Sequence, residues 1–176
     1  LNEMYDQDLK ILTPDINYSD YKFKVHEDKI IYGLAALKGV GEESMKELVT
    51  ERNKNGKFKS LSDFNDRLSR SVLNKRQIEK LILSNSLNLI NKNISKLFAN
   101  VENIIHKKSG AALFKDLSDD QFFLNKNYNT VDPIKAEFES YGFLYSQKKQ
   151  TKILTNLNQS SFKDKINSKL EFFCLL

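Results

Sequence analysis

Two glycines with a single residue between them constrain the fold of this 176-residue chain more than any other feature. Gly39 and Gly41 separate a short apolar segment, residues 33–38, from residues 42–53, where apolar side chains recur at helical spacing. A Gly-x-Gly joint allows backbone angles that other residues rarely adopt. The sequence therefore predicts two helices that meet at a tight turn. With only 2 Pro and 6 Gly in the chain, an all-β fold punctuated by these residues is not expected.

Helical periodicity recurs along the rest of the chain, which predicts a mainly α fold. Four more helices are expected, at residues 61–68, 75–83, about 91–107 and 133–145. Residues suited to cap a helix N-terminus precede three of them, namely Ser60 or Ser62, Asn74 and Asp132.

Three segments have a different character. Residues 21–25 alternate apolar and charged side chains, and the apolar run 29–32 follows after a polar turn, which predicts a short β-hairpin. Residues 108–130 lack periodicity and are interpreted as a linker. The apolar residues 170–176 are interpreted as the beginning of a strand.

Composition argues against several classes of function. Cys174 is the only cysteine and His26 and His106 are the only histidines, so neither a disulfide framework nor a zinc or iron–sulfur site is expected. No apolar run approaches 18 residues, and the chain opens without a secretory signal. We therefore expect a cytoplasmic protein without a metal site and without a membrane partner.

The glycine turn has the chemistry of an anion site. The missing side chains at Gly39 and Gly41 leave the N–H groups at the start of the second helix uncovered, and the helix dipole adds positive potential there. Val40 is expected to anchor the turn in the core, while Lys38 and Lys46 add charge. Such a site suits the phosphate backbone of a nucleic acid and does not read its sequence. The alternative is a helix corner in which glycine serves only as a C-cap.

Basic residues concentrate around this turn. The chain carries a net charge of +5, and between Lys38 and Lys80 eleven basic residues stand against seven acidic ones. A local excess of this kind indicates an electrostatic footprint for phosphate, and chance clustering is the alternative.

Five short motifs then occur in a fixed order. They are Thr-Pro-Asp-Ile-Asn at 13–17, Ile-Tyr-Gly-Leu at 31–34, Lys-Gly-Val-Gly at 38–41, Gly-Lys-Phe-Lys-Ser-Leu-Ser-Asp-Phe at 56–64 and Leu-Asn-Lys-Arg at 73–76. This ordered set resembles the bacterial replicative DNA polymerase III alpha subunit, at the end of its fingers region and in its tandem helix-hairpin-helix domain. Residues 137–143 are similar to the segment that leads into the OB-fold of that family.

The resemblance implies a fold and a division of the chain. The fold is mainly α, with a tandem helix-hairpin-helix domain preceded by a small β-hairpin and with the start of an OB-type strand at the C-terminus. Residues 1–32 correspond to the end of the fingers region and residues 33–107 to the tandem DNA-binding domain. Residues 108–130 form the linker, and residues 131–176 form a helix and the lead-in to a truncated OB-fold.

The resemblance also implies that this segment grips double-stranded DNA through its phosphate backbone. The residues assigned to DNA binding are Lys38, Gly39, Val40, Gly41, Lys46, Lys75 and Arg76. The family also allows a monovalent cation at the hairpin carbonyls. The second hairpin of the tandem is expected at residues 83–87, where Asn85 stands in place of the glycine of the family. Asparagine tolerates left-handed backbone geometry best among the other residues.

Catalysis is expected to lie elsewhere. In the family, palm-domain aspartates upstream of this segment hold Mg²⁺ and transfer the nucleotide, so the chain alone is expected to be inactive. Its own carboxylates Asp15, Asp63 and Asp66 are interpreted as caps and surface charges. In the linker, residues 110–114 resemble the short peptide with which the family binds the sliding clamp in the replisome. Leu113 and Phe114 are the expected contacts, and Gly110 replaces the usual glutamine.

Two other functions remain open from the sequence. A helix-hairpin-helix DNA repair enzyme, a glycosylase or lyase, would cleave abasic sites, but the predicted β-hairpin has no place in that fold. A protein-interaction module would bind the clamp through Leu113 and Phe114 and ignore DNA. The simplest remaining interpretation is a helical domain with a glycine corner.

Overall fold

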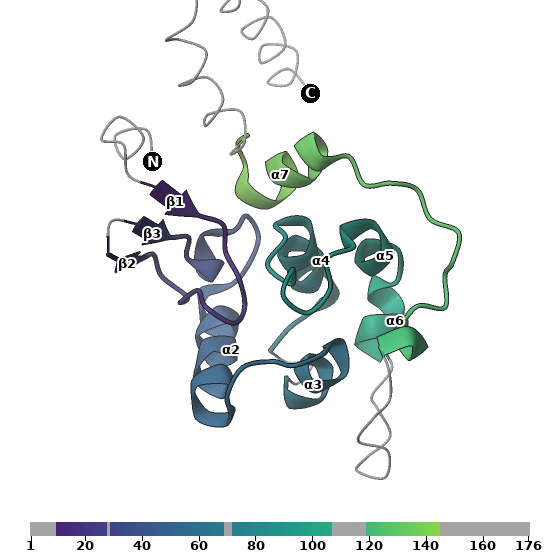
Figure 1. Cartoon of the computed structure of the whole chain (residues 1–176), viewed down its shortest axis with the longest axis horizontal. Helices are drawn as coiled ribbons and strands as arrows, with labels where there is room; N and C mark the ends of the chain where they lie inside the picture. Colours follow the sequence, from purple (N-terminus) through teal and green to yellow (C-terminus); the bar gives the residue numbers. More distant parts are fainter. Residues whose placement is uncertain (1–9, 28, 69–71, 107–118, 145–176) are drawn as a thin grey trace, which may run out of the picture. The chain divides into compact units, whose positions relative to one another are not determined.

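A computed structural model describes residues 10–27, 29–68, 72–106 and 119–144. The chain divides into two units, residues 1–143 and 144–176, and the helices and strands given below belong to the first (Figure 1). Two features expected from the sequence, the Leu113-Phe114 pair and the strand at 170–176, lie outside the described residues.

A small three-stranded sheet opens the described part. Strands β2 (Lys24–His26) and β3 (Lys29–Ile31) form the predicted antiparallel hairpin. Strand β1 (Lys10–Leu12) was not predicted; it pairs in parallel with β3 and places the buried Ile11 beside Ile30. A three-residue strand is too short to show an alternating pattern, and its partner lies far along the chain.

The remainder is mainly helical, as predicted. Its elements are η1 (Leu34–Ala36), α2 (Glu42–Asn55), α3 (Leu61–Arg67), α4 (Lys75–Leu83), α5 (Ile94–Ala99), α6 (Val101–His106), η2 (Asp119–Phe122) and α7 (Pro133–Tyr141). Helix α4 packs against α5, α6 and α7 and lies among them in Figure 1. It buries Ile78, Leu81, Ile82 and Leu83 and forms the centre of the helical core.

Local capping signals predicted the helix starts well. Ser60 accepts a hydrogen bond from the N–H of Asp63 at 3.0 Å, so Ser60 and not Ser62 caps α3. Asn74 caps α4 within a capping box, and Asp132 accepts from the N–H of Ile134 at 2.8 Å at the start of α7.

Three expected helices differ in extent. The segment 33–38 is a single 3₁₀ turn, and α7 ends before Gly142, which takes a left-handed φ of 79°. The long helix expected at 91–107 is broken at Asn100 into α5 and α6. Asn100 is fully buried, and its side chain pairs with both backbone groups of Asn125, at 2.8 and 3.0 Å. This buried pairing fixes the site of the break.

Part of the predicted linker is packed on the domain. The carboxylate of Asp119 accepts hydrogen bonds from the N–H groups of Leu61 and Ser62 at the start of α3, the shortest at 3.1 Å. Phe122 and Phe123 are both buried. Residues 119–123 are therefore part of the folded unit.

The loop that precedes the sheet hairpin is hydrogen-bonded to α2 and to the loop that follows α2. Asn17 accepts from the N–H of Phe58 at 2.8 Å and donates to its carbonyl at 2.9 Å. Arg52 of α2 donates to the carbonyls of Ile16 and Ser19. Two of the motifs recognised in sequence, at 13–17 and 56–64, thus contact each other directly.

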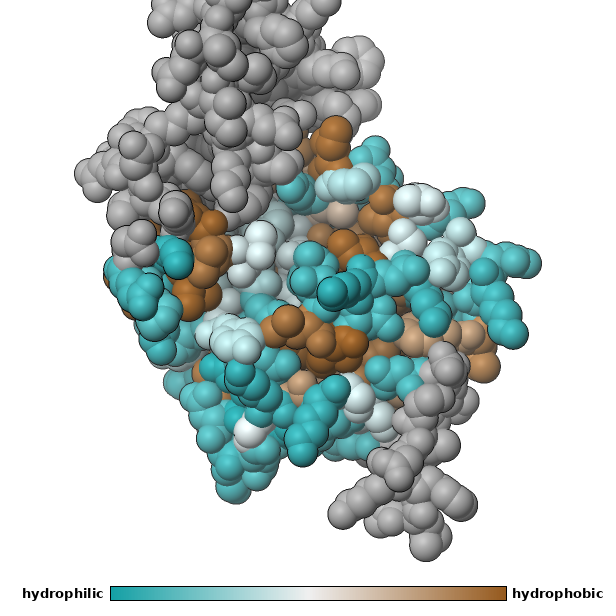
Figure 2. All heavy atoms as spheres, viewed as in Figure 1, coloured by the Kyte–Doolittle hydropathy of each residue, from teal (hydrophilic) through white to brown (hydrophobic). Residues whose placement is uncertain are grey.

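The described surface carries apolar side chains in separate places. On the face in Figure 2, hydrophilic side chains predominate and apolar ones form patches between them. The exposed large apolar residues include Phe23 and Val25 near the sheet and Ile134 and Phe138 one turn apart on α7. None of the described helices has both the length and the apolar character needed to cross a membrane.

Candidate nucleic-acid interface

The first turn, residues 37–41, takes the geometry that its glycines predict. Gly39 has a left-handed φ of +76°, and Gly41 is extended at the N-cap position of α2. Val40 lies between them and is buried, while its N–H donates to the carbonyl of Leu37 at 3.2 Å. The valine holds the turn against the core and leaves the two glycines at the surface.

This turn presents backbone donors to solvent. Gly41 has no side chain with which to cap α2. Within the described part of the chain, neither Gly39 nor Gly41 donates its N–H to a protein acceptor. An anion that binds there meets these N–H groups and the positive end of a helix of 14 residues.

Two lysines flank the turn. Lys38 is exposed, its N–H donates to the carbonyl of Ser140 at 2.7 Å, and its Nζ lies 5.6 Å from the centre of the Phe138 ring. Lys46 is exposed one turn into α2. Both side chains can add positive charge beside the turn.

Arg76 reaches the same turn from α4. A Cβ atom at Gly39 would lie 3.4 Å from Nε and from Nη2 of Arg76, so the guanidinium lies against the face that glycine leaves open. Arg76 is exposed, and no salt bridge of the described residues involves it. The structure thus places the Arg76 guanidinium beside Gly39 of the turn.

Lys75 faces a different environment. Its Nζ forms an ion pair with Glu102 of α6 and lies 3.9 Å from Glu79. The hydrogen bond to Glu102 raises the pKa of Lys75 above its usual value. This ammonium group therefore has protein partners already and is less available to a phosphate than the guanidinium of Arg76.

The second turn, residues 84–86, has the expected left-handed residue but offers fewer donors. Asn85 takes a φ of 63°, as the tolerance of asparagine for this geometry predicted. The N–H groups of Ser84, Asn85 and Ser86 all donate at 2.9 Å to carbonyls at the end of α4. Both serines are buried. The two turns of the tandem are therefore not equivalent.

The end of α7 contacts both turns. The carbonyl of Ser140 accepts the N–H of Lys38 in the first turn, and the hydroxyl of Tyr141 donates to the carbonyl of Ser84 in the second at 3.0 Å. Lys80 and Glu139 also join α4 to α7, with Nζ and Oε2 3.5 Å apart. The sequence indicated no such role for this helix.

The carboxylates considered in the sequence have structural contacts. Asp15 accepts from the N–H of Asn17 at 2.7 Å, and burial raises the pKa of Asp15. Asp63 accepts from the N–H of Lys59 at 2.9 Å and pairs with Arg67 at 3.2 Å. Among the described residues, no group of three or more His, Cys, Asp or Glu is placed to hold a metal ion.

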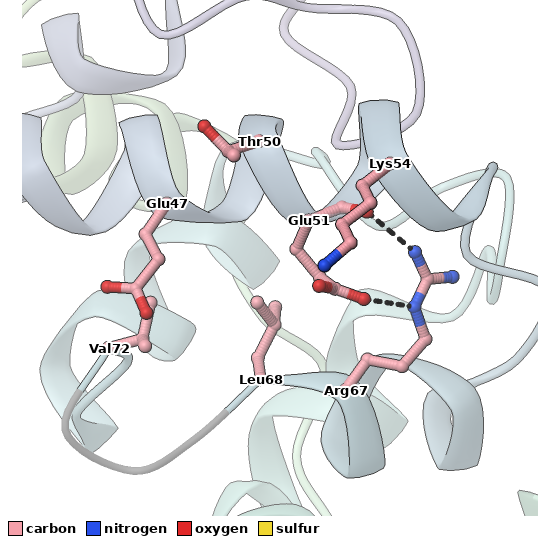
Figure 3. A pocket seen from close by; sticks show the side chains of 7 residues that line it. All are labelled: Glu47, Thr50, Glu51, Lys54, Arg67, Leu68 and Val72. Atoms are coloured by element: carbon pink, nitrogen blue, oxygen red, sulfur yellow. Dashed lines mark hydrogen bonds and ion pairs between the residues drawn. The ribbon is translucent and has the colours of Figure 1, made fainter.

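A pocket of about 270 Å³ lies between α2 and α3 (Figure 3). Its lining residues are Glu47, Thr50, Glu51, Lys54, Arg67, Leu68 and Val72. Arg67 donates to the Glu51 carboxylate at 3.0 Å and to the Glu51 carbonyl at 3.2 Å, as the dashed lines show. Because carboxylates line the pocket and engage its arginine, it is a poor place for a phosphate.

Sequence reasoning missed Gln77. Gln77 is buried at the third position of α4 and donates from Nε2 to Oγ of Ser44 in α2 at 3.0 Å. The spacing Asn74-x-x-Gln77 is a capping-box signal and was readable in the sequence. The contact with Ser44 depends on tertiary packing, and the sequence alone does not predict it.

Comparisons with known proteins agree with this geometry. A family model described as helix-hairpin-helix motif matches residues 8–97. The chain is 35% identical over 147 residues to DNA polymerase III subunit alpha of Buchnera aphidicola subsp. Schizaphis graminum, covering 78% of this chain and 13% of that protein. It is 38% identical over 110 residues to the same subunit of Vibrio cholerae, covering 62% of this chain and 10% of that protein. It is 45% identical over 85 residues to the subunit of Escherichia coli, covering 48% of this chain and 7% of that protein.

These findings confirm the resemblance expected from the ordered motifs, and with it the mainly α fold. The chain spans about an eighth of the length of the Buchnera protein and less of the other two.

Proposed function

The chain belongs to the helix-hairpin-helix motif family, and on that basis we propose that its first turn binds the phosphate backbone of double-stranded DNA without sequence specificity. The observation that carries the proposal is the meeting of Gly39, Gly41 and Arg76 at one exposed place. N–H groups at a helix start and a guanidinium are suitable partners for phosphate oxygens. Lys38 and Lys46 extend the positive surface.

Titration of a labelled duplex across salt concentrations tests this proposal. If two to four phosphates are neutralised, the logarithm of the affinity falls with the logarithm of salt at a slope of roughly −2 to −4. Binding should be nearly the same for duplexes of equal length and different sequence. A strong preference among such duplexes, or no binding at low salt, would contradict the proposal.

Arg76 and Lys75 form a matched pair of neighbours for mutation. Arg76→Ala is expected to lower duplex affinity about tenfold and to reduce the salt slope by about one, because it removes a cation placed at the turn. Lys75→Ala is expected to cost less than about threefold, because its ammonium is paired with Glu102 and Glu79. Anisotropy titrations of both variants measure the difference, and a larger effect at Lys75 would place the phosphate elsewhere.

The much longer relatives support a wider proposal. We infer that the whole protein is a replicative DNA polymerase that performs nucleotidyl transfer with residues outside this chain. In that protein this segment would hold the primer–template duplex behind the active site. The chain would then supply the grip on DNA and no catalytic group of its own.

We also propose that Leu113 and Phe114 bind the sliding clamp. In the sequence they fall between His106, where α6 ends, and Asp119, which is hydrogen-bonded to the start of α3. Two adjacent apolar side chains suit insertion into a pocket of a partner. Phe114→Ala should abolish capture by the clamp and leave duplex affinity unchanged, whereas Arg76→Ala should weaken duplex binding about tenfold and leave clamp capture unchanged. Clamp capture by a chain that does not bind duplex would favour the protein-interaction module.

A further inference from the structure

One buried amide joins the starts of two helices at the proposed DNA-binding turn. The Oε1 of Gln77 accepts the N–H of Asn74 at 3.0 Å, which completes the capping box of α4. Its Nε2 donates to Oγ of Ser44 at 3.0 Å, at the third position of α2. Only 7% of Gln77 is exposed. The starts of α2 and α4 are therefore hydrogen-bonded to each other through a single side chain.

The two contacts need both ends of an amide. The N–H of Asn74 requires an acceptor, which orients Oε1 toward it and leaves Nε2 toward Ser44. A methionine of similar length supplies neither group. A glutamate supplies the acceptor for Asn74 and can accept from the Ser44 hydroxyl, but it carries a negative charge.

This side chain also lies next to the backbone of the turn. A Cβ atom at Gly41 would come within 3.3 Å of Nε2 of Gln77, and Arg76 is the preceding residue of α4. The contact that joins the start of α4 to α2 therefore sets where the backbone of Arg76 lies relative to the turn, and the Arg76 guanidinium lies against Gly39. A charge at position 77 would lie beside the N–H groups of the turn.

We propose that Gln77 is a positioning residue for DNA binding. It holds Arg76 and the Gly39–Gly41 turn in the relative placement that one phosphate group requires, and its neutrality keeps that place attractive to an anion. This inference rests on the proposed binding of duplex DNA by the first turn.

Gln77→Glu tests the neutrality of this position. Because glutamate is a usual partner in a capping box and this place lies at the positive ends of two helices, the variant should still fold, which circular dichroism verifies. Duplex affinity should fall about tenfold or more, since like charges that meet in a complex are strongly unfavourable. The control is Asn127→Asp, which makes the same charge change at an exposed residue. Its neighbour Tyr128 accepts a hydrogen bond from Asn93, the residue before α5. Asn127→Asp should reduce affinity much less.

Gln77→Met tests the positioning role. Loss of both hydrogen bonds should shift the NMR amide resonances of Gly39 and Gly41 and leave that of Gly56, at the other end of α2, in place. Duplex affinity of the folded protein should fall at least threefold, with the salt slope reduced toward that of Arg76→Ala.

If the unsubstituted chain binds duplex DNA, either of two results would overturn the inference. One is Gln77→Glu binding as tightly as Asn127→Asp, and the other is Gln77→Met binding as tightly as the unsubstituted chain. Failure of the unsubstituted chain to bind duplex at low salt would instead overturn the proposed function, and this inference with it.

Discussion

Gly39→Val is expected to reduce duplex affinity about a hundredfold, which corresponds to about 3 kcal/mol. The φ of +76° at this position disfavours a β-branched side chain. The added methyl groups would also extend beyond a Cβ that already lies 3.4 Å from the Arg76 guanidinium. The substitution therefore displaces Arg76 and covers the N–H groups of the turn together.

Gly56→Val provides the control for backbone strain. Gly56 also has a left-handed φ, of +84°, but no atom beyond its own chain neighbours lies within 4 Å of the place where its Cβ would be. Gly56→Val should destabilise the fold to a similar degree and keep duplex affinity. Anisotropy titrations of both variants, with circular dichroism to verify the fold, separate the two effects. Equal affinities of the folded variants would show that Gly39 has no special part in binding.

Phe122→Ala is expected to lower the free energy of unfolding by about 3–5 kcal/mol. Phe122 is fully buried within a segment that the sequence pattern indicated to be a linker. In a true linker the same substitution would change stability by no more than about 0.5 kcal/mol. For a domain whose total stability is of the order of 5–15 kcal/mol, the loss should be visible as a large decrease in the urea midpoint.

Leu124→Ala, two residues further on, is the matched control. Leu124 is 63% exposed, so its truncation should have little effect on the urea midpoint. Indistinguishable midpoints for Phe122→Ala and Leu124→Ala would mean that this segment does not contribute to the core.

The features that sequence reasoning predicted correctly are local ones. Ser60, Asn74 and Asp132 each cap a helix that begins at the next residue. Gly39 takes left-handed geometry because it has no Cβ, and Asn85 because asparagine tolerates this geometry. These signals need no knowledge of the rest of the chain.

The features that it missed depend on distant partners. The break at Asn100 follows from pairing with Asn125, and β1 exists because it lies beside β3. Lys75 and Arg76 were assigned to phosphate alike, and the ion pair of Lys75 with Glu102, a carboxylate 27 residues away, was not predicted. A pattern of residue types along the chain contains no information about which of two neighbouring cations will meet a carboxylate.

The contacts of α7 indicate which residues must accompany the two turns when this part of the chain is transferred to another protein. The match to the helix-hairpin-helix family ends at residue 97, but Ser140 and Tyr141 hold one turn each of the tandem. A segment cut at the family boundary would leave the Lys38 N–H and the Ser84 carbonyl without these partners. The smallest portion that can be moved intact between proteins therefore extends through Gly142, well beyond the residues that the family model matches.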